Sequence, residues 1–140
     1  MARVMRGVAL IVEDDPHLQK AMSVHLAAMD FEVRVAPHYE AAVGHLTTAG
    51  EPSIVCVDIE LPTASGYEVC EYIRGPLGLR RVPILVTSDS GFPEDMASAE
   101  EAGANAFLKK PFSMREFGTF VEALLAEAPS SRPGGRYPRP

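Results

Sequence analysis

The sequence has 140 residues, 46% hydrophobic and 23% charged, which fits one compact domain rather than a repeat array, a collagen or a wholly disordered chain. Its 13 lysines and arginines against 19 acidic residues give a formal net charge of -6, which argues against broad contact with nucleic-acid phosphates. The longest early apolar run ends at Val12, too short for a signal peptide or a membrane span. We therefore expect a cytoplasmic protein that binds neither nucleic acid nor membrane directly.

Five short apolar runs alternate along the chain with stretches of helical periodicity, a pattern typical of alternating β/α domains. The first, third and fourth runs are apolar almost throughout, as expected for parallel strands covered on both faces. The second, FEVRV, alternates in polarity, which predicts a half-exposed edge strand. The predicted strands are Val8–Val12, Phe31–Ala36, Ser53–Val57, Val82–Val86 and Ala104–Leu108.

Five helices are predicted between and after these strands. The first follows Asp15, a good N-cap residue, and has Pro16 in its first turn. The last has the clearest amphipathic pattern, and the fourth the weakest. The predicted ranges are Pro16–Met29, Tyr39–Thr48, Gly66–Arg74, Glu94–Ala102 and Met114–Ala126.

The C-terminal segment and the two cysteines can also be interpreted from composition. Residues 129–140, PSSRPGGRYPRP, are rich in proline, glycine and arginine and offer little to bury. We predict a folded domain over residues 1–128, followed by a disordered tail or the start of a linker. Cys56 and Cys70 lie in apolar surroundings without the spacing of a zinc site, so they are expected to be buried, reduced thiols.

Acidic residues close several of the predicted strands, at the edge where open parallel sheets bind their ligands. Glu13, Asp14 and Asp15 follow the first strand, and Asp58 closes the third. If these strands are adjacent, the carboxylates converge and repel one another unless a cation neutralises them. Hard oxygen ligands favour Mg²⁺, with Mn²⁺ as an alternative, and an aspartate beside such an ion can be a nucleophile that forms an acyl phosphate.

A lysine and a hydroxyl, the groups that balance phosphoryl charge, occur at the ends of the other strands as Lys110 and Thr87. The whole ordered set resembles the receiver domain of two-component response regulators over about residues 7 to 127. The segments that carry the resemblance are VEDDP, VDIELP followed by SGYEVCEYIR, ILVTS, and AGANAFLKKPF.

The resemblance implies a doubly wound α/β fold, a (βα)5 three-layer sandwich with a five-stranded parallel sheet in the order 2-1-3-4-5. It also implies a signalling switch that accepts a phosphoryl group from a histidine kinase or a histidine phosphotransfer protein. Such a protein is not an enzyme acting on an outside substrate, because it catalyses only its own phosphorylation and dephosphorylation. Its downstream target is not identified by the sequence.

The resemblance also assigns roles around the acceptor. Asp58 would be the phosphoacceptor. Asp15 and Asp58, together with the backbone carbonyl of Glu60, would hold Mg²⁺, and Asp14 would act through a bound water. The side chain of Glu60 adds a negative charge beside the phosphoryl group, which is expected to alter the hydrolysis rate.

The remaining roles concern the response to phosphorylation. Lys110 would pair first with the acceptor carboxylate and then with the phosphoryl group, and its bond to Pro111 is expected to be cis. Thr87 would move toward the phosphoryl oxygen and Phe107 would turn inward behind it, shifting the face formed by the fourth helix and the fifth strand. Phe107 stands where the family commonly has tyrosine, so it can pack but cannot hydrogen-bond.

Two segments depart from regulators that dimerise through this face. Asn105-Ala106 and FVEALLAEA lack the acidic residue and the arginine that such regulators usually carry, which predicts a monomer or a weak dimer.

Simpler interpretations stand beside these roles. Glu13, Asp14 and Asp15 could simply cap the first helix, where a negative charge meets the positive helix end. Phe107 could be an ordinary core residue.

Three other functions share features with this sequence. A nucleotide- or flavin-binding domain is disfavoured because the loop EDDPH would repel a phosphate. An aspartyl-phosphate hydrolase of the haloacid-dehalogenase type requires an aspartate at the position of Glu60. It also requires a cap insertion, for which the chain has no room. A receiver-like scaffold that only binds partners would be expected to lose one of the acidic residues or Lys110, and none is missing.

Overall fold

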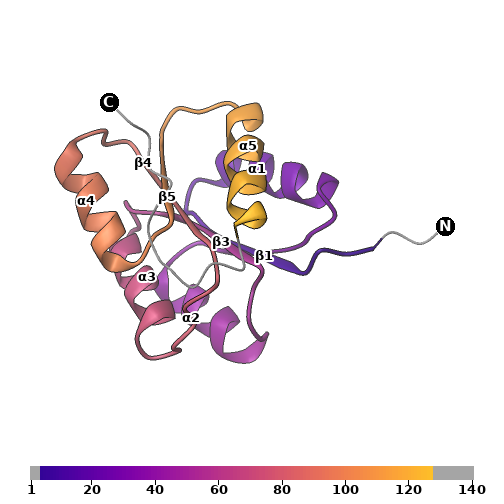
Figure 1. Cartoon of the computed structure of the whole chain (residues 1–140), viewed down its shortest axis with the longest axis horizontal. Helices are drawn as coiled ribbons and strands as arrows, with labels where there is room; N and C mark the ends of the chain where they lie inside the picture. The colour runs from indigo at the N-terminus through magenta and orange to yellow at the C-terminus, as the bar shows by residue number, and fades with distance from the viewer. Residues whose placement is uncertain (1–3, 128–140) are drawn as a thin grey trace.

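The computed structural model describes residues 4–127, so the tail predicted at residues 129–140 lies outside the described residues. Five parallel strands form one sheet in the order β2-β1-β3-β4-β5 (Figure 1), which confirms the predicted α/β fold class and strand order. The strands are β1 Val8–Val12, β2 Glu32–Ala36, β3 Ile54–Asp58, β4 Ile84–Ser88 and β5 Ala106–Lys109.

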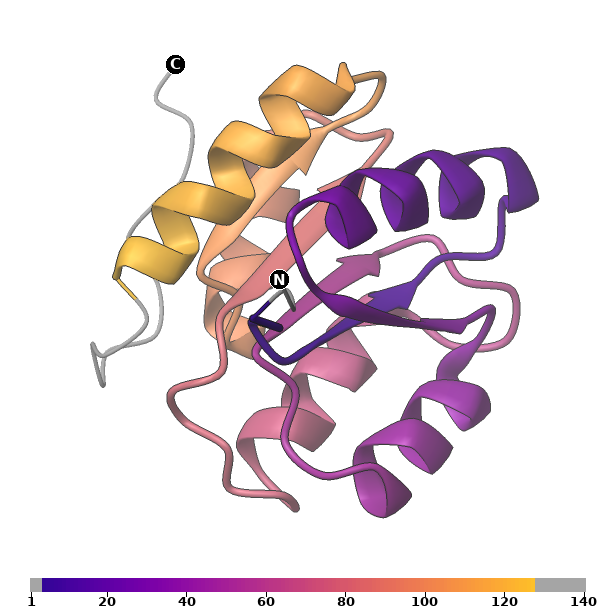
Figure 2. The same cartoon turned by 90° about the vertical axis from the view of Figure 1, so that its right-hand side faces the viewer.

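Five helices cover the sheet on both sides and make it the middle of three layers (Figure 2). One side carries α1 and α5, which pack against each other, and the other carries α2, α3 and α4. Each predicted helix is present, with its ends within two residues of the predicted ones. The helices are α1 Pro16–Ala28, α2 Tyr39–Thr48, α3 Gly66–Arg74, α4 Pro93–Ala102 and α5 Met114–Ala126.

Two apolar clusters, one on each face of the sheet, form the core. Because side chains alternate along a strand, Leu10 and Val12 of β1 pack toward α2, α3 and α4, whereas Ala9 and Ile11 pack toward α1 and α5. The central strands β1, β3 and β4 are almost completely buried. By contrast β2 is only partly buried, as its alternating sequence predicts for an edge strand.

The two cysteines are buried and free, as predicted. Burial raises the pKa of the Cys56 thiol to about 12, and burial is also the main cause that raises the pKa of Cys70 to about 12. Both residues therefore act as small apolar core side chains.

At the amino ends of β4 and β5, the guanidinium of Arg74 ties three segments together. Its Nε donates to the carbonyl of Gly103 at 3.0 Å, and its Nη1 donates to the carbonyl of Leu79 at 2.8 Å. Its Nη2 donates to Oδ1 of Asn105 at 2.8 Å, and the same oxygen accepts the N–H of Ile84 at 2.8 Å. Gly103 has a φ of +112°, and a Cβ there would lie 2.5 Å from the Arg74 side chain.

Within residues 4–127, no helix is long and apolar enough to cross a membrane.

Candidate functional site

A pocket of about 710 Å³ opens at the carboxyl edge of the sheet, where the acidic residues were predicted to lie. Its lining comes from the segments that follow β1, β3, β4 and β5, so residues far apart in the chain meet there. The charged residues that line it are Glu13, Asp14, Asp15, Asp58, Glu60, Asp89 and Lys110.

Asp58 is the last residue of β3 and lies at the bottom of this pocket, with 2% of its surface exposed. Its Oδ2 accepts a hydrogen bond from Lys110 Nζ at 3.0 Å, and its Oδ1 accepts the N–H of Glu60 at 3.2 Å. The start of α3 packs directly on its backbone, because a Cβ at Gly66 would lie 2.2 Å from the Asp58 carbonyl oxygen. The absence of a side chain at Gly66 therefore helps to fix the position of Asp58.

Glu13 lies beside Asp58 in the interior and is only 1% exposed. Its N–H continues the pairing of β1 by donating to the carbonyl of Ala36 at 3.0 Å. Because Val12 is paired with Val57, the next residues along the two strands, Glu13 and Asp58, are neighbours on the same face of the sheet. Glu13 Oε1 lies 3.1 Å from Lys110 Nζ, so the lysine bridges both carboxylates.

Three carboxylates are close enough to share a cation. Glu13, Asp14 and Asp58 each offer an oxygen, and these atoms lie within 4.8 Å of one another. Two of the three side chains are buried, so their charges are poorly screened by water. Such a set of hard oxygen donors fits Mg²⁺ or Mn²⁺.

Asp15, one of the predicted metal ligands, makes a different contact in the structure. Its side chain is the N-cap of α1 and accepts the N–H of His17 at 3.0 Å, while its own N–H donates to Glu13 Oε2 at 3.0 Å. Asp15 lines the same pocket, but the carboxylate grouped with Asp14 and Asp58 belongs to Glu13. The physical reason is where β1 ends: Glu13 still pairs with β2 and lies beside Asp58, whereas the chain has turned into α1 by Asp15, whose side chain caps the helix.

The sequence interpretation counted Glu13 among the acids that close the first strand but gave it no role in the site, although a signal was available. Ile11 and Glu13 are two residues apart and therefore share a face of the strand, as do Cys56 and Asp58. Extending the strand alternation by one residue beyond Val12 would have indicated Glu13 as the partner of Asp58.

The electrostatics of the pocket favour an Asp58 carboxyl that is protonated or neutralised by a cation. Burial raises the pKa of Asp58 to about 7, and the charge of Glu13 adds to that rise, whereas Lys110 and the Glu60 N–H oppose it. Burial alone would lower the pKa of Lys110, but its hydrogen bonds and ion pairs with Asp58 and Glu13 raise it overall. Lys110 is therefore a cation, and the pocket holds more negative charge than it balances.

The other predicted residues surround Asp58. The peptide bond between Lys110 and Pro111 is cis, as predicted, and the neighbouring Lys109 is exposed. Thr87 is buried on β4 and is the register partner of Asp58. The ring of Phe107 is 1% exposed and belongs to the core cluster under α2, α3 and α4, so it already lies inside the fold.

Glu60 lines the pocket, but its side chain is engaged elsewhere. Its Oε2 accepts the hydroxyl of Ser88 at 2.7 Å, and its Oε1 accepts the N–H of Asp89 at 3.1 Å. The loop that follows β3 is thereby tied to the loop that follows β4. The predicted role of the Glu60 backbone carbonyl as a metal ligand stays a prediction.

Comparison with known proteins identifies a family that matches most of the chain. Residues 9–122 match the model of the response regulator receiver domain. The chain is 31% identical over 119 residues to the transcriptional regulatory protein GltR of Pseudomonas aeruginosa, covering 85% of this chain and 49% of that protein. It is 32% identical over 120 residues to the transcriptional regulatory protein KdpE of Mycobacterium tuberculosis, covering 84% and 50%. The chain thus spans about half the length of the curated relatives it matches.

Two of the solved structures match over nearly their whole length. A chain of Chloroflexus aurantiacus whose crystal structure is described as that of a response regulator has 31% identity and a TM-score of 0.78, covering 86% of this chain and 98% of that one. The CheY4 chemotaxis response regulator of Vibrio cholerae has a TM-score of 0.80 at 21% identity, covering 86% and 99%. At that identity the second likeness supports the fold only.

Proposed function

Because the chain belongs to the response regulator receiver domain family, we propose that it is a signalling switch in which Asp58 accepts a phosphoryl group. The donor would be the phosphohistidine of a histidine kinase or of a histidine phosphotransfer protein. The observation that carries this proposal is the buried Asp58 carboxylate, which is bridged to Glu13 by Lys110 and lies within metal-sharing distance of Asp14.

In this proposal Asp14 and Asp58, with the backbone carbonyl of Glu60, hold Mg²⁺ or Mn²⁺, and Glu13 acts through a bound water. The ion would screen the carboxylates and bind an oxygen of the incoming phosphoryl group. These ligands replace the set that included Asp15, because the Asp15 carboxylate caps α1.

The chemical step is a displacement at phosphorus. A carboxylate oxygen of Asp58 forms the new P–O bond, the P–N bond of the phosphohistidine breaks, and its electron pair returns to the imidazole nitrogen. Asp58 must be ionised to attack, and the proximity of Lys110 favours the ionised form. Lys110 then balances the added phosphoryl charge, and the Thr87 hydroxyl donates to a phosphoryl oxygen.

The output would be a change at the face formed by α4 and β5. Since Phe107 is already buried, the movement of Thr87 and of the loop after β4 would contribute more to this change than a rotation of the ring. We also propose that the domain acts in the cytoplasm as a monomer or a weak dimer. In support of this, the Asn105 side chain is occupied within the chain by Arg74 and Ile84.

Mixing the protein with acetyl phosphate and Mg²⁺ tests the function. We expect intact-mass measurement to show one added phosphoryl group, which is labile to hydroxylamine and absent from Asp58→Asn. Asp89→Asn is the matched control, because Asp89 is an aspartate that lines the same pocket, and it should still be labelled. An unlabelled wild type, or an equally labelled Asp58→Asn variant, contradicts the proposal.

The hydrolase alternative is not supported by the position of the Glu60 side chain. Such an enzyme would use an acid two residues after the nucleophile to protonate the leaving group of its substrate. The Glu60 carboxylate instead accepts hydrogen bonds from Ser88 and from the N–H of Asp89.

A further inference from the structure

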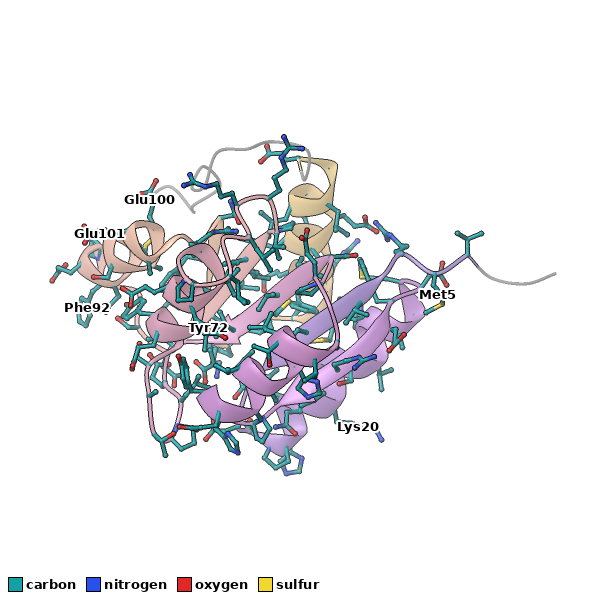
Figure 3. The ribbon with its side chains drawn as sticks, turned by 90° about the horizontal axis from the view of Figure 1, so that it is seen from below. Met5, Lys20, Tyr72, Phe92, Glu100 and Glu101 are labelled. Atoms are coloured by element: carbon teal, nitrogen blue, oxygen red, sulfur yellow. The ribbon has the colours of Figure 1, made fainter. Side chains whose placement is uncertain are left out.

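The start of α4 differs from the starts of the other helices in residues 4–127. The helices α1, α2, α3 and α5 each begin at a side chain that accepts a backbone N–H, whereas the residue at the N-cap of α4, Phe92, makes no such bond. Phe92 is 67% exposed and lies at the outer edge of the molecule (Figure 3). The first turn of α4 must therefore be held in place by other contacts.

Those contacts form a chain of hydrogen bonds that we call the serine relay, made of Glu60, Ser88, Ser90 and Asp95. The Ser88 hydroxyl donates to Glu60 Oε2 at 2.7 Å and accepts the N–H of Ser90 at 3.0 Å. The Ser90 hydroxyl donates to Asp95 Oδ2 and accepts the N–H of Phe92 at 3.3 Å. The relay thus runs from the rim of the pocket into the first turn of α4.

A backbone hydrogen bond connects the relay to Asp58, the proposed phosphoacceptor. Asp58 Oδ1 accepts the N–H of Glu60, so a change at the Asp58 carboxylate reaches the residue whose side chain holds Ser88. Ser88 is 0% exposed, which means that a loss of its acceptor leaves a buried hydroxyl without that bond. On the α4 side, the Asp95 carbonyl also accepts the hydroxyl of Tyr67 at 3.2 Å, which links α4 to α3.

We propose that Glu60 is a positioning residue that couples the phosphorylation pocket to the first turn of α4 through the serine relay. The inference rests on the proposed function, because phosphorylation of Asp58 is the signal that the relay transmits. The serine relay supplies a route to α4 that does not depend on Phe107, whose ring is already buried and carries no hydroxyl.

Hydrogen–deuterium exchange of the amides in residues 89–96 tests the relay without ligand. Glu60→Gln and Ser90→Ala should each raise exchange at the Ser90 and Phe92 amides about fivefold, the size expected for one net hydrogen bond. Together they should have no more effect than the larger single change, because both interrupt one chain. The matched controls Glu94→Gln and Ser98→Ala lie on the exposed face of α4 and should leave exchange unchanged.

The second arm adds acetyl phosphate and Mg²⁺ and records the intact mass together with exchange. Ser90→Ala should take up the phosphoryl group as the wild type does, yet its α4 amides should respond at least about threefold less. Ser90→Thr keeps the hydroxyl and should restore the response. Unchanged exchange without ligand, or a full α4 response in labelled Ser90→Ala, overturns the inference. A wild type that takes up no phosphoryl group would instead refute the proposed function, while the unliganded arm would still decide whether the relay positions α4.

Discussion

The two ends of the parallel sheet handle charge in opposite ways. At the carboxyl ends of β1 and β3, Glu13 and Asp58 are buried side by side and share one cation, Lys110. At the amino ends of β4 and β5, the single charge of Arg74 is met by the carbonyls of Gly103 and Leu79 and by the Asn105 amide oxygen.

This difference indicates that one end of the sheet serves ligand binding and the other serves stability. Buried like charges raise the free energy of the folded state, and they persist where a ligand or a reaction uses them. The Arg74 guanidinium joins neighbouring segments, and its charge faces carbonyl and amide oxygens rather than a like charge. We therefore expect the Arg74 end to contribute stability and the Asp58 end to cost stability until a cation or a phosphoryl group binds.

The largest expected loss of stability comes from removing the Arg74 guanidinium. Arg74→Met keeps much of the apolar stem but deletes three charge-assisted hydrogen bonds, so we expect the free energy of unfolding to fall by about 3 kcal/mol. Urea unfolding measures this loss. Under native conditions, labelling of Asp58 by acetyl phosphate should be unchanged.

The control is Arg115→Met, which changes an exposed arginine on α5 and should alter stability by less than about 0.5 kcal/mol. If Arg74→Met cost no more than Arg115→Met, or if it abolished labelling, the assignment of stability to one end and binding to the other would be wrong.

At the opposite end, Gly66→Ala should disturb both properties. The new Cβ would lie 2.2 Å from the Asp58 carbonyl oxygen, so either α3 or Asp58 must move. We expect a loss of about 2 kcal/mol in urea unfolding, typical of overpacking, and a clear weakening of Mg²⁺ affinity measured by titration. Gly44→Ala in α2, where nothing lies within 4 Å of an added Cβ, is the control and should be stabilising or neutral. A normal Mg²⁺ affinity in Gly66→Ala would show that the metal site tolerates movement of Asp58.

An effect of the opposite sign, a gain in stability, is expected for Asp58→Asn in the absence of metal. The pKa of Asp58 is raised to about 7, so the folded wild type loses stability as the pH rises from the unfolded pKa of about 3.9 through 7. Asparagine carries no charge at any pH. The variant should therefore match the wild type near pH 4 and exceed it by about 4 kcal/mol at pH 8.

Urea unfolding at the two pH values, with chelator present, measures this difference. Asp89→Asn is the control, because Asp89 is exposed and should show no gain that grows with pH. Equal stability of wild type and Asp58→Asn at pH 8 would mean that Lys110 already compensates the buried charge in full.

The sequence was sufficient for the strands and for most of the pocket because these follow from local patterns, whereas the strand order came from the resemblance to receiver domains. Apolar runs predicted the strands, and strand ends predicted Asp58, Thr87 and Lys110, which the structure brings together. The ends of β4 differ by two residues from the prediction, since the apolar run begins at Val82 but pairing begins at Ile84, after Pro83.

Features that depend on contacts between distant segments were not predicted. The bonds of Arg74 join α3 to the residues before β4 and β5, and no spacing in the sequence indicates such a pairing. The link from Glu60 to Ser88 likewise depends on how two loops meet. Among the acids after β1, composition alone could not tell an inward side chain from a helix cap.

The smallest expected effect distinguishes a helix cap from a metal ligand among the acids after β1. Asp15→Ala removes the N-cap of α1, so stability should fall by about 1 kcal/mol, and Asp15→Asn should keep most of it because asparagine also caps helices. Mg²⁺ affinity should stay within about threefold of wild type in Asp15→Ala, since only a nearby charge is lost. In Asp14→Ala, by contrast, it should fall sharply, because Asp14 belongs to the carboxylate group around Asp58. Calorimetric titration of both variants makes the comparison. A collapse of Mg²⁺ affinity in Asp15→Ala, with normal affinity in Asp14→Ala, would return Asp15 to the metal site and make the cap incidental.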